Sequence, residues 1–155
     1  MKVVLLNELA KLPTRKHETD AGLDLYANET VQILPGEFRI VKTGISIELP
    51  KNTFGWITNK SRNNFLIGGG IVDEGYTGEL LVKVFNPTQL PVSIVLNQAF
   101  AQLLVIPIVK PEVTESVSVT LKTERGVSGG IVEQVNFVTW NESGTNSLSF
   151  GTEPE

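Results

Sequence analysis

The sequence predicts an all-β fold, a distorted jelly-roll or β-barrel-like single domain followed by a flexible C-terminal arm. Apolar residues recur mainly with period two in short runs, and no segment carries a sustained helical stripe. Turn residues separate these runs, for example Pro35-Gly36, Pro50-Lys51-Asn52 and Asn86-Pro87-Thr88. Their spacing is typical of sandwiches and jelly rolls rather than of βαβ units. With 155 residues, 41% of them hydrophobic, we expect one domain with a real core.

Eight segments have the alternation and the turn boundaries of strands. In order, the expected strands are Lys2 to Leu6, Leu23 to Ala27, Phe38 to Leu49, Thr53 to Thr58, Glu79 to Asn86, Val92 to Leu96, Phe100 to Ile108 and Glu112 to Leu121. At most one helical turn is expected, at Leu6 to Leu12. From about Gly126 onward the composition shifts to Gly, Ser, Asn, Thr and Glu, which favours a mobile arm. We therefore divide the chain into a β domain, 1–124, and an arm, 125–155.

Composition excludes several classes of function. The chain has no cysteine and one histidine, so thiolate metal sites, cysteine nucleophiles and multi-histidine metal centres are excluded. The net charge of −4 opposes binding to polymeric nucleic acid, and an anionic substrate would need locally placed cations. No apolar run approaches the roughly 20 residues of a membrane span, and the start is too short for a signal peptide. We expect a cytoplasmic protein without a membrane partner.

The stretch from Gly68 to Glu79 is the most informative part of the sequence. It places Asp73 and one aromatic ring, Tyr76, among five glycines between apolar strands. Glycine allows bare backbone to approach a flat ligand, a carboxylate holds a hydroxyl or a water, and an aromatic ring forms a wall against a sugar. The stretch is either a nucleotide pocket or a glycine-rich hairpin in which Asp73 only caps a turn.

Four other segments carry polar groups that a plain β-sandwich does not require. Asp24 stands between Leu23 and Leu25 in a predicted strand, so its carboxylate is solvated, paired or near a cation. Gln102 interrupts an apolar strand, and its amide needs partners, in the protein or in a bound water. The alternatives are structural: Asp24 simply faces solvent, and the Gln102 amide is only hydrogen-bonded within the protein.

The remaining two segments offer cations. Lys60, Ser61 and Arg62 follow a strand and together offer charge and directional hydrogen bonds to phosphate oxygens, although GxxxxGK[ST] is absent. Arg125 precedes a glycine-rich run at the root of the arm, a segment that either closes over a phosphate chain or serves as a linker. Alone, the first of these is equally compatible with a plain polar loop.

Taken in order, the five segments resemble the five motifs of the trimeric dUTPase family, the deoxyuridine triphosphate pyrophosphatases with a jelly-roll-like fold. Ala21 to Leu25 is similar to the first motif, Lys60-Ser61 to the second and Gly70 to Glu79 to the third. Ala101-Gln102-Leu103 and Arg125-Gly126 are similar to the fourth and fifth. The third motif is highly specific, and the match covers most of the chain.

The resemblance implies a site and a reaction. Asp73 contacts the deoxyribose 3′-hydroxyl and holds the attacking water, and Tyr76 packs on the sugar and excludes a 2′-hydroxyl. The uracil edge is read by main-chain groups of Gly70, Ile71, Val72 and Asp73 and near Leu81. Lys60, Ser61 and Arg62 bind phosphates, Gln102 orients polar groups or water, and Asp24 meets Mg²⁺ through water. Water attacks the α-phosphorus of dUTP, giving dUMP and pyrophosphate in a homotrimer whose sites lie at subunit interfaces.

The sequence departs from the family pattern in two places. Lys60 stands where members usually carry arginine, and lysine offers a point charge instead of a fork. After Arg125 no aromatic residue follows at the usual spacing, and we expect Phe150, beyond an atypical insertion, to stack on uracil. Two alternatives remain. One is a non-catalytic nucleotide-binding or regulatory homologue. The other is a dCTP deaminase or its bifunctional form, which Lys83 disfavours because it stands where that enzyme carries its catalytic Glu.

Overall fold

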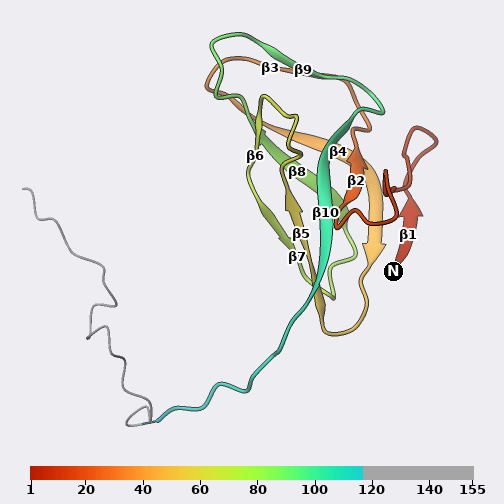
Figure 1. Cartoon of the computed structure of the whole chain (residues 1–155), viewed down its shortest axis with the longest axis vertical. Coiled ribbons are helices and arrows are strands. Elements are labelled where there is room, and N and C mark those ends of the chain that lie inside the picture. The colour runs from red at the N-terminus through yellow and green to blue at the C-terminus, as the bar shows by residue number, and fades with distance from the viewer. Residues whose placement is uncertain (117–155) are drawn as a thin grey trace, which may run out of the picture. The chain divides into compact units, whose positions relative to one another are not determined.

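The computed structural model describes residues 1–116 and consists of antiparallel β-strands (Figure 1). Met1–Glu112 forms one compact unit, and Val113–Glu155 forms a second, of which residues 113–116 are described. The strands are β1 (Lys2–Leu5), β2 (Leu23–Tyr26), β3 (Val31–Ile33), β4 (Phe38–Glu48), β5 (Thr53–Thr58), β6 (Leu66–Ile67), β7 (Gly70–Val72), β8 (Glu79–Phe85), β9 (Val92–Ile94) and β10 (Ala99–Pro107). Within residues 1–116, no helix is long and apolar enough to cross a membrane.

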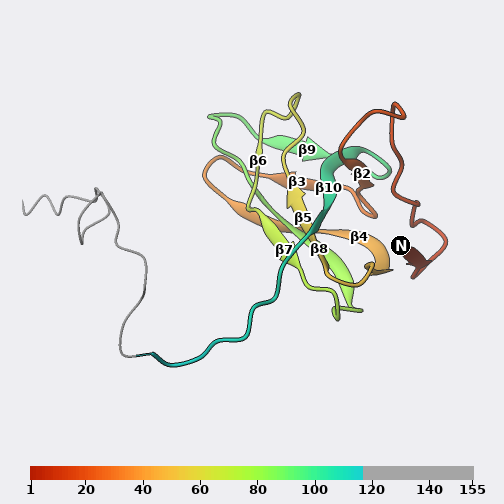
Figure 2. The same cartoon turned by 60° about the horizontal axis from the view of Figure 1, so that its bottom comes forward.

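The strands form two four-stranded sheets and a small third sheet. One sheet has the order β1-β4-β8-β6, the other has the order β2-β10-β5-β7, and β3 pairs with β9. The β3–β9 pair lies at one end of the two larger sheets, at the top of Figure 1, and the rotated view of Figure 2 separates the sheets. Consecutive strands often lie in different sheets, so residues far apart in sequence become neighbours.

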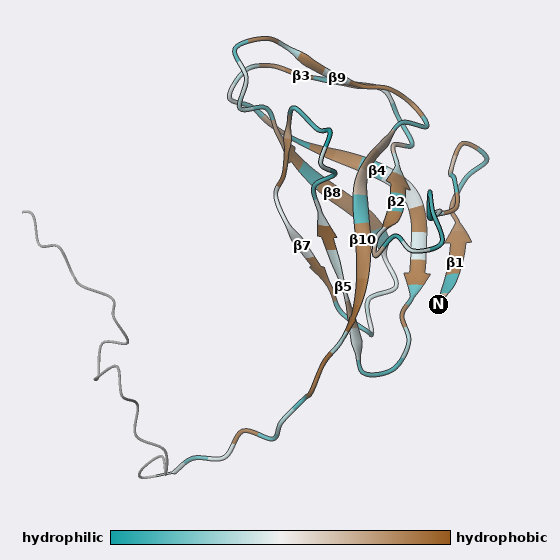
Figure 3. Cartoon of the chain, in the orientation of Figure 1, coloured by the Kyte–Doolittle hydropathy of each residue, from teal (hydrophilic) through white to brown (hydrophobic). Residues whose placement is uncertain are grey.

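The core lies between the inner faces of the two larger sheets. In β8, Leu80, Val82 and Val84 are buried while Leu81 and Lys83 are exposed, as the two-residue period of a strand requires. The apolar strands stand out by hydropathy in Figure 3. Each fully buried leucine or valine side chain contributes about 1.5–3 kcal/mol relative to an exposed one. Burial of alternate residues therefore fixes which face of each strand carries functional groups.

The predicted turns are confirmed where they can be checked. Gly36 takes a φ of 73° and Asn52 a φ of 58°, values that glycine and asparagine tolerate better than most other residues. Asn86 is fully buried, and its side-chain nitrogen donates to the carbonyls of Ile33 and Leu90 at 2.9 and 2.8 Å. Asn86 is therefore a structural residue that ties the end of β3 to the segment around Leu90.

The all-β class is confirmed, and seven of the eight expected strands are present with ends shifted by at most two residues. The expected strand from Glu112 to Leu121 is wrong over 112–116, which adopt no strand, and its remainder lies outside the described residues. Three strands were missed, β3, β6 and β7, which have two or three residues each. So short a run shows no clear alternation, and β7 begins inside the glycine run. The expected domain boundary at 124 also lies beyond the described part.

Candidate functional site

Asp24, Gln102 and Thr58 lie side by side across three neighbouring strands. In the β2–β10–β5 ladder, Gln102 pairs in register with Asp24 on one side and with Thr58 on the other. Residues paired in register share a face of the sheet. In the next row along the ladder, Leu103 and Ile57 are buried in the core. The polar row therefore occupies the outer face of this sheet.

The loop after β5 places a cation on this row. The Lys60 ammonium donates to an Asp24 carboxylate oxygen, and these side chains are 21% and 18% exposed. The loop is anchored by two asparagines: Asn59 accepts from a backbone N–H of β6 at 2.5 Å, and Asn63 donates to a backbone carbonyl of β10 at 2.7 Å. The Asp24 carboxylate is thus paired with a cation, one of the three environments expected from the sequence.

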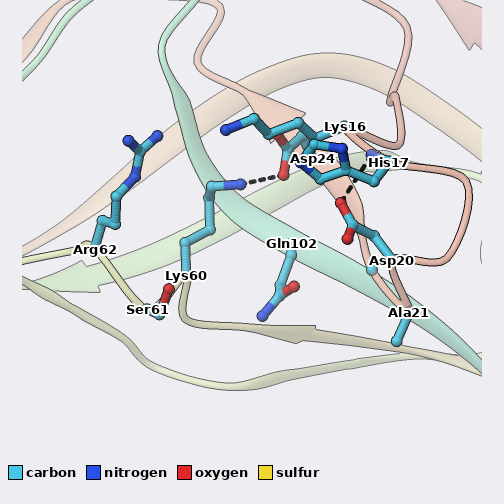
Figure 4. A pocket seen from close by; sticks show the side chains of 10 residues that line it. Lys16, His17, Asp20, Ala21, Asp24, Lys60, Ser61, Arg62 and Gln102 are labelled. Atoms are coloured by element: carbon cyan, nitrogen blue, oxygen red, sulfur yellow. Dashed lines mark hydrogen bonds and ion pairs between the residues drawn. The ribbon is translucent and has the colours of Figure 1, made fainter.

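A cleft of about 470 Å³ opens beside the ion pair (Figure 4). The structure brings together five residues from the first, second and fourth motifs, which the sequence analysis assigned to phosphate binding, to Mg²⁺ or to the orientation of water. These lining residues are Asp24, Lys60, Ser61, Arg62 and Gln102. We call this space the polar cleft. Its three segments are far apart in sequence and meet only because β2, β10 and β5 are neighbours.

Gln102 is held by the backbone, as expected for an amide in an apolar strand. Its nitrogen donates to the Asn59 carbonyl at 2.6 Å. A Cβ at Gly22 would collide with the Gln102 amide oxygen, so the Ala-Gly of the first motif leaves room for that amide. Gln102 therefore links the loop that carries Lys60 to the turn that precedes Asp24.

Sequence reasoning missed one wall of the polar cleft. Lys16, His17 and Asp20 also line it, on the loop that precedes β2. Their signal was the basic run Arg15-Lys16-His17 just before the first motif, but an exposed loop carries no periodicity that marks it. This loop, residues 15–22, therefore adds two side chains that can carry positive charge.

The glycine-rich segment forms a second cleft, of about 220 Å³, between β7 and β8. Ile57 and the start of β8 contribute to its walls. Apart from Phe150, which lies outside the described residues, the residues expected to bind the nucleoside line it, namely Gly70, Ile71, Val72, Asp73, Tyr76 and Leu81. We call this space the glycine cleft. Part of the segment is a strand, because Gly70–Val72 pairs with β5.

The tyrosine wall of the glycine cleft is held by short-range contacts. The Tyr76 N–H donates to the Asp73 carbonyl at 3.0 Å, which closes a turn, and the Tyr76 hydroxyl donates to the Glu79 carbonyl at 2.9 Å. A Cβ at Gly78 would lie 2.5 Å from the Tyr76 hydroxyl oxygen. Asp73 therefore takes part in a turn, as the structural alternative required, but through its carbonyl, so its carboxylate remains available.

Glu74 anchors the same turn to two other segments. Its carboxylate accepts from the Lys110 ammonium and from the Asn52 backbone N–H, the latter at 3.0 Å. The Lys110 hydrogen bond, and after it the Asn52 hydrogen bond, lowers the pKa of Glu74 below its usual value of 4.5. The turn between Asp73 and Tyr76 is thus stabilised by its own backbone hydrogen bond and by contacts of Glu74 with two other segments.

The two clefts share no lining residue and lie well apart in one chain. Asp24 lies on β2 and Asp73 follows β7, at opposite edges of the β2-β10-β5-β7 sheet. Three strand spacings separate the two edges, roughly 14 Å at about 4.8 Å per strand. One chain therefore cannot bring both carboxylates to the same reacting atom.

The residues expected in the arm lie beyond the described part of the chain. Arg125 and Phe150 lie outside the described residues, as does the rest of the expected arm. Within residues 1–116 there is also no group of three or more His, Asp or Glu side chains that could hold a metal ion. The polar cleft offers two carboxylates, Asp24 and Asp20, on its walls.

Comparisons with known proteins identify the family and the fold. The sequence model of the dUTPase family matches residues 8–131. A deoxyuridine 5′-triphosphate nucleotidohydrolase of Crocosphaera subtropica is 37% identical over 135 residues, 83% of this chain and 94% of that protein. A mutant dUTPase of Staphylococcus bacteriophage 80alpha, solved with dUpNHpp, superposes with a TM-score of 0.76 at 27% identity over 81% of this chain and 92% of the other. A dUTPase mutant of S. aureus phage phi11, solved with a structural Mg(II) ion, gives 0.73 at 27% identity over 77% and 98%.

Proposed function

Because the chain belongs to the dUTPase family, we propose that its two clefts together hydrolyse dUTP to dUMP and pyrophosphate. The observation that supports this proposal is that the two clefts offer different chemical groups. The glycine cleft offers main-chain groups, an aromatic wall and one free carboxylate, which suit a deoxynucleoside. The polar cleft offers cations and amide and hydroxyl groups, which suit a phosphate chain.

In the glycine cleft we propose that Tyr76 packs against deoxyribose and leaves no room for a 2′-hydroxyl. The ring lies close against Gly78, and its hydroxyl donates to the Glu79 carbonyl, so it cannot easily move to admit a larger sugar. Main-chain groups from Gly70 to Asp73 and near Leu81 read the uracil edge. Asp73 holds the 3′-hydroxyl and the water that attacks the α-phosphorus.

In the polar cleft we propose that Lys60, Ser61 and Arg62 bind the phosphates and neutralise the charge that develops as pyrophosphate leaves. Charge neutralisation and in-line positioning provide most of the rate enhancement in such reactions. Gln102, held at its nitrogen by the Asn59 carbonyl, lines the cleft, where we propose that its oxygen accepts from a water or another donor. Asp24, already beside Lys60, completes the polar row.

The residues present fit Mg²⁺ that is carried by the substrate. Mg²⁺ keeps several waters and is commonly bound by one or two carboxylates plus substrate phosphates. The polar cleft meets this description, because Asp24 and Asp20 line it and no three-ligand cage exists within residues 1–116. Asp24 would hold the ion through water. When bound, Mg²⁺ would neutralise phosphate charge and orient the triphosphate.

We propose that each working site joins the polar cleft of one copy to the glycine cleft of another, in a homotrimer. The separation of Asp24 and Asp73 in one chain supports this arrangement, since a water held by Asp73 must lie about 3–3.5 Å from the phosphorus that it attacks. Exposed apolar side chains on the outer face of the first sheet, including Phe38 and Ile40, provide surface for contact between copies. Arg125 and Phe150 remain predictions for the closing arm, and the cytoplasm, where nucleotide pools lie, remains the proposed location.

The test is an assay of the purified full chain with Mg²⁺ and four substrates, dUTP, dCTP, dTTP and UTP. Pyrophosphate and ammonia are measured separately. We expect pyrophosphate from dUTP alone and no ammonia. Ammonia from dCTP would indicate a deaminase, while nucleotide binding without turnover would identify a non-catalytic homologue; either result contradicts the proposed function.

A further inference from the structure

The loop of residues 15–22 forms a wall of the polar cleft that no sequence motif assigned. Lys16 lies on this wall, and Figure 4 shows its side chain extending across the cleft toward the side that carries Arg62. The proposed phosphate-binding residues Lys60, Ser61 and Arg62 lie together on a separate loop, after β5. A ligand between the two loops thus has a cation on each side.

The charges that line the polar cleft leave two cations available. Lys60 is paired with Asp24, and the Asp20 carboxylate accepts from the His17 backbone N–H at 3.0 Å. Lys16 and Arg62 have no ion-pair partner among residues 1–116. This local excess of positive charge occurs in a chain whose net charge is −4. The cleft therefore attracts anions, and Lys16 has no structural ion pair to maintain.

The backbone around Lys16 is fixed before any ligand binds. The Arg15 guanidinium donates to the carbonyls of Asp20 and Ala21, the latter at 3.0 Å. The Asp20 N–H donates to the His17 carbonyl at 3.1 Å, and the loop is closed at its base by the Asp24 N–H, which donates to the Thr14 carbonyl at 2.8 Å. A preformed loop loses little backbone freedom on binding, so a contact by Lys16 is retained as affinity.

We propose that Lys16 is a further phosphate-binding residue, which contacts the terminal phosphates of the substrate and the pyrophosphate that is released. The ligand class is an inorganic or nucleotide-borne diphosphate. The assignment rests on the proposed function for the identity of the substrate, but the anion site itself is defined by Lys16 and Arg62 on facing loops. A compact ammonium group suits this role, because it binds phosphate as a point charge.

The experiment is calorimetric titration of the full chain with inorganic pyrophosphate in the presence of Mg²⁺. The variants are Lys16→Ala, Lys16→Arg and the control Lys11→Ala. Lys11 belongs to the same N-terminal segment, but its ammonium lies over the Tyr26 ring, 4.2 Å from the centroid, and does not line the cleft. Lys16→Gln serves as a second neutral variant if the alanine variant melts at a lower temperature than the wild type.

We expect Lys16→Ala to weaken pyrophosphate binding by roughly tenfold, as for the loss of one charge-assisted contact, while Lys16→Arg retains most of the affinity. KM for dUTP should rise by a similar factor, and inhibition by dUMP, which lacks the terminal phosphates, should not change. Lys11→Ala should behave as wild type in each measurement.

Equal pyrophosphate affinity in wild type and Lys16→Ala would overturn the inference, and so would a wild-type chain that does not bind pyrophosphate. The proposed function fails separately. If the chain binds pyrophosphate through Lys16 but does not hydrolyse dUTP, the inference stands and the proposed function is contradicted. If the chain hydrolyses dUTP but Lys16→Ala leaves pyrophosphate binding unchanged, the proposed function stands and the inference is contradicted.

Discussion

The polar cleft and the glycine cleft are built in different ways. Side chains from three segments far apart in sequence form the polar cleft, and they meet because β2, β10 and β5 are neighbours. The glycine cleft is largely one continuous segment with the start of β8, and its shape depends on backbone and on missing Cβ atoms. Substitutions in the polar cleft should therefore change its charge and its affinity for phosphate. Substitutions in the glycine cleft should change its shape.

The largest effect is expected at Asp73. Replacing Asp73 with Asn keeps the turn, which uses the backbone carbonyl, but removes the carboxylate that holds water. We expect kcat for dUTP to fall by about 10²–10⁴-fold, the usual contribution of a positioned base, with KM little changed. Steady-state kinetics measures both. The control is Glu48→Gln, because Glu48 is an exposed carboxylate paired with Lys2. If Asp73→Asn retains wild-type kcat, Asp73 has no catalytic role.

A second test concerns the close contact between Gly78 and the Tyr76 ring. In Gly78→Ala the new Cβ displaces the Tyr76 ring, and overpacking of this kind costs about 1–3 kcal/mol. We expect KM for dUTP to rise roughly tenfold and discrimination against UTP to weaken, since the sugar wall moves. Gly75→Ala is the matched control, because nothing lies within 4 Å of a Cβ at that position. Equal kinetics in the two variants would contradict the role of Tyr76.

The polar cleft should respond to charge rather than to shape. Lys60→Ala removes a phosphate contact and leaves Asp24 without its cation, so we expect KM for dUTP to rise about tenfold. Lys60→Arg, which restores the residue usual in the family, should match or exceed wild-type affinity because arginine can bind phosphate with two bonds. An arginine variant as weak as the alanine variant would show that Lys60 is not a phosphate contact.

The smallest effect is expected at Glu74, and it depends on pH. Its folded-state pKa is lowered by Lys110 first and by Asn52 second, so its stabilising contribution is present above the unfolded pKa, near 4.5, and is lost as the pH falls through the lower folded value. Glu74→Gln should therefore melt below the wild type at pH 7 by a small margin, and the two curves should converge below pH 4.5. A difference that does not shrink as the pH falls below 4.5 would contradict this interpretation.

Local sequence pattern predicts best the cleft that is built from one nearly continuous segment. The glycine cleft contains all six residues expected from Gly70 to Leu81, because that motif is nearly continuous. Asp24 and Gln102 were identified singly, but their pairing in register across β2 and β10 depends on strand order, which local pattern does not encode. Lys16 was missed because exposed loops lack periodicity. The separation of the two clefts follows from the strand order of the sheet, which local sequence pattern does not reveal.

The most direct test of a site shared between copies is subunit complementation. Asp73→Asn disables only the glycine cleft, and Lys60→Ala combined with Asp24→Ala disables only the polar cleft. Each variant alone should be nearly inactive. If each site joins clefts from two copies, mixed oligomers formed by co-expression should recover roughly a quarter of wild-type dUTP hydrolysis, because random assembly leaves that share of sites intact. Activity that stays at the level of the separate variants would contradict the account.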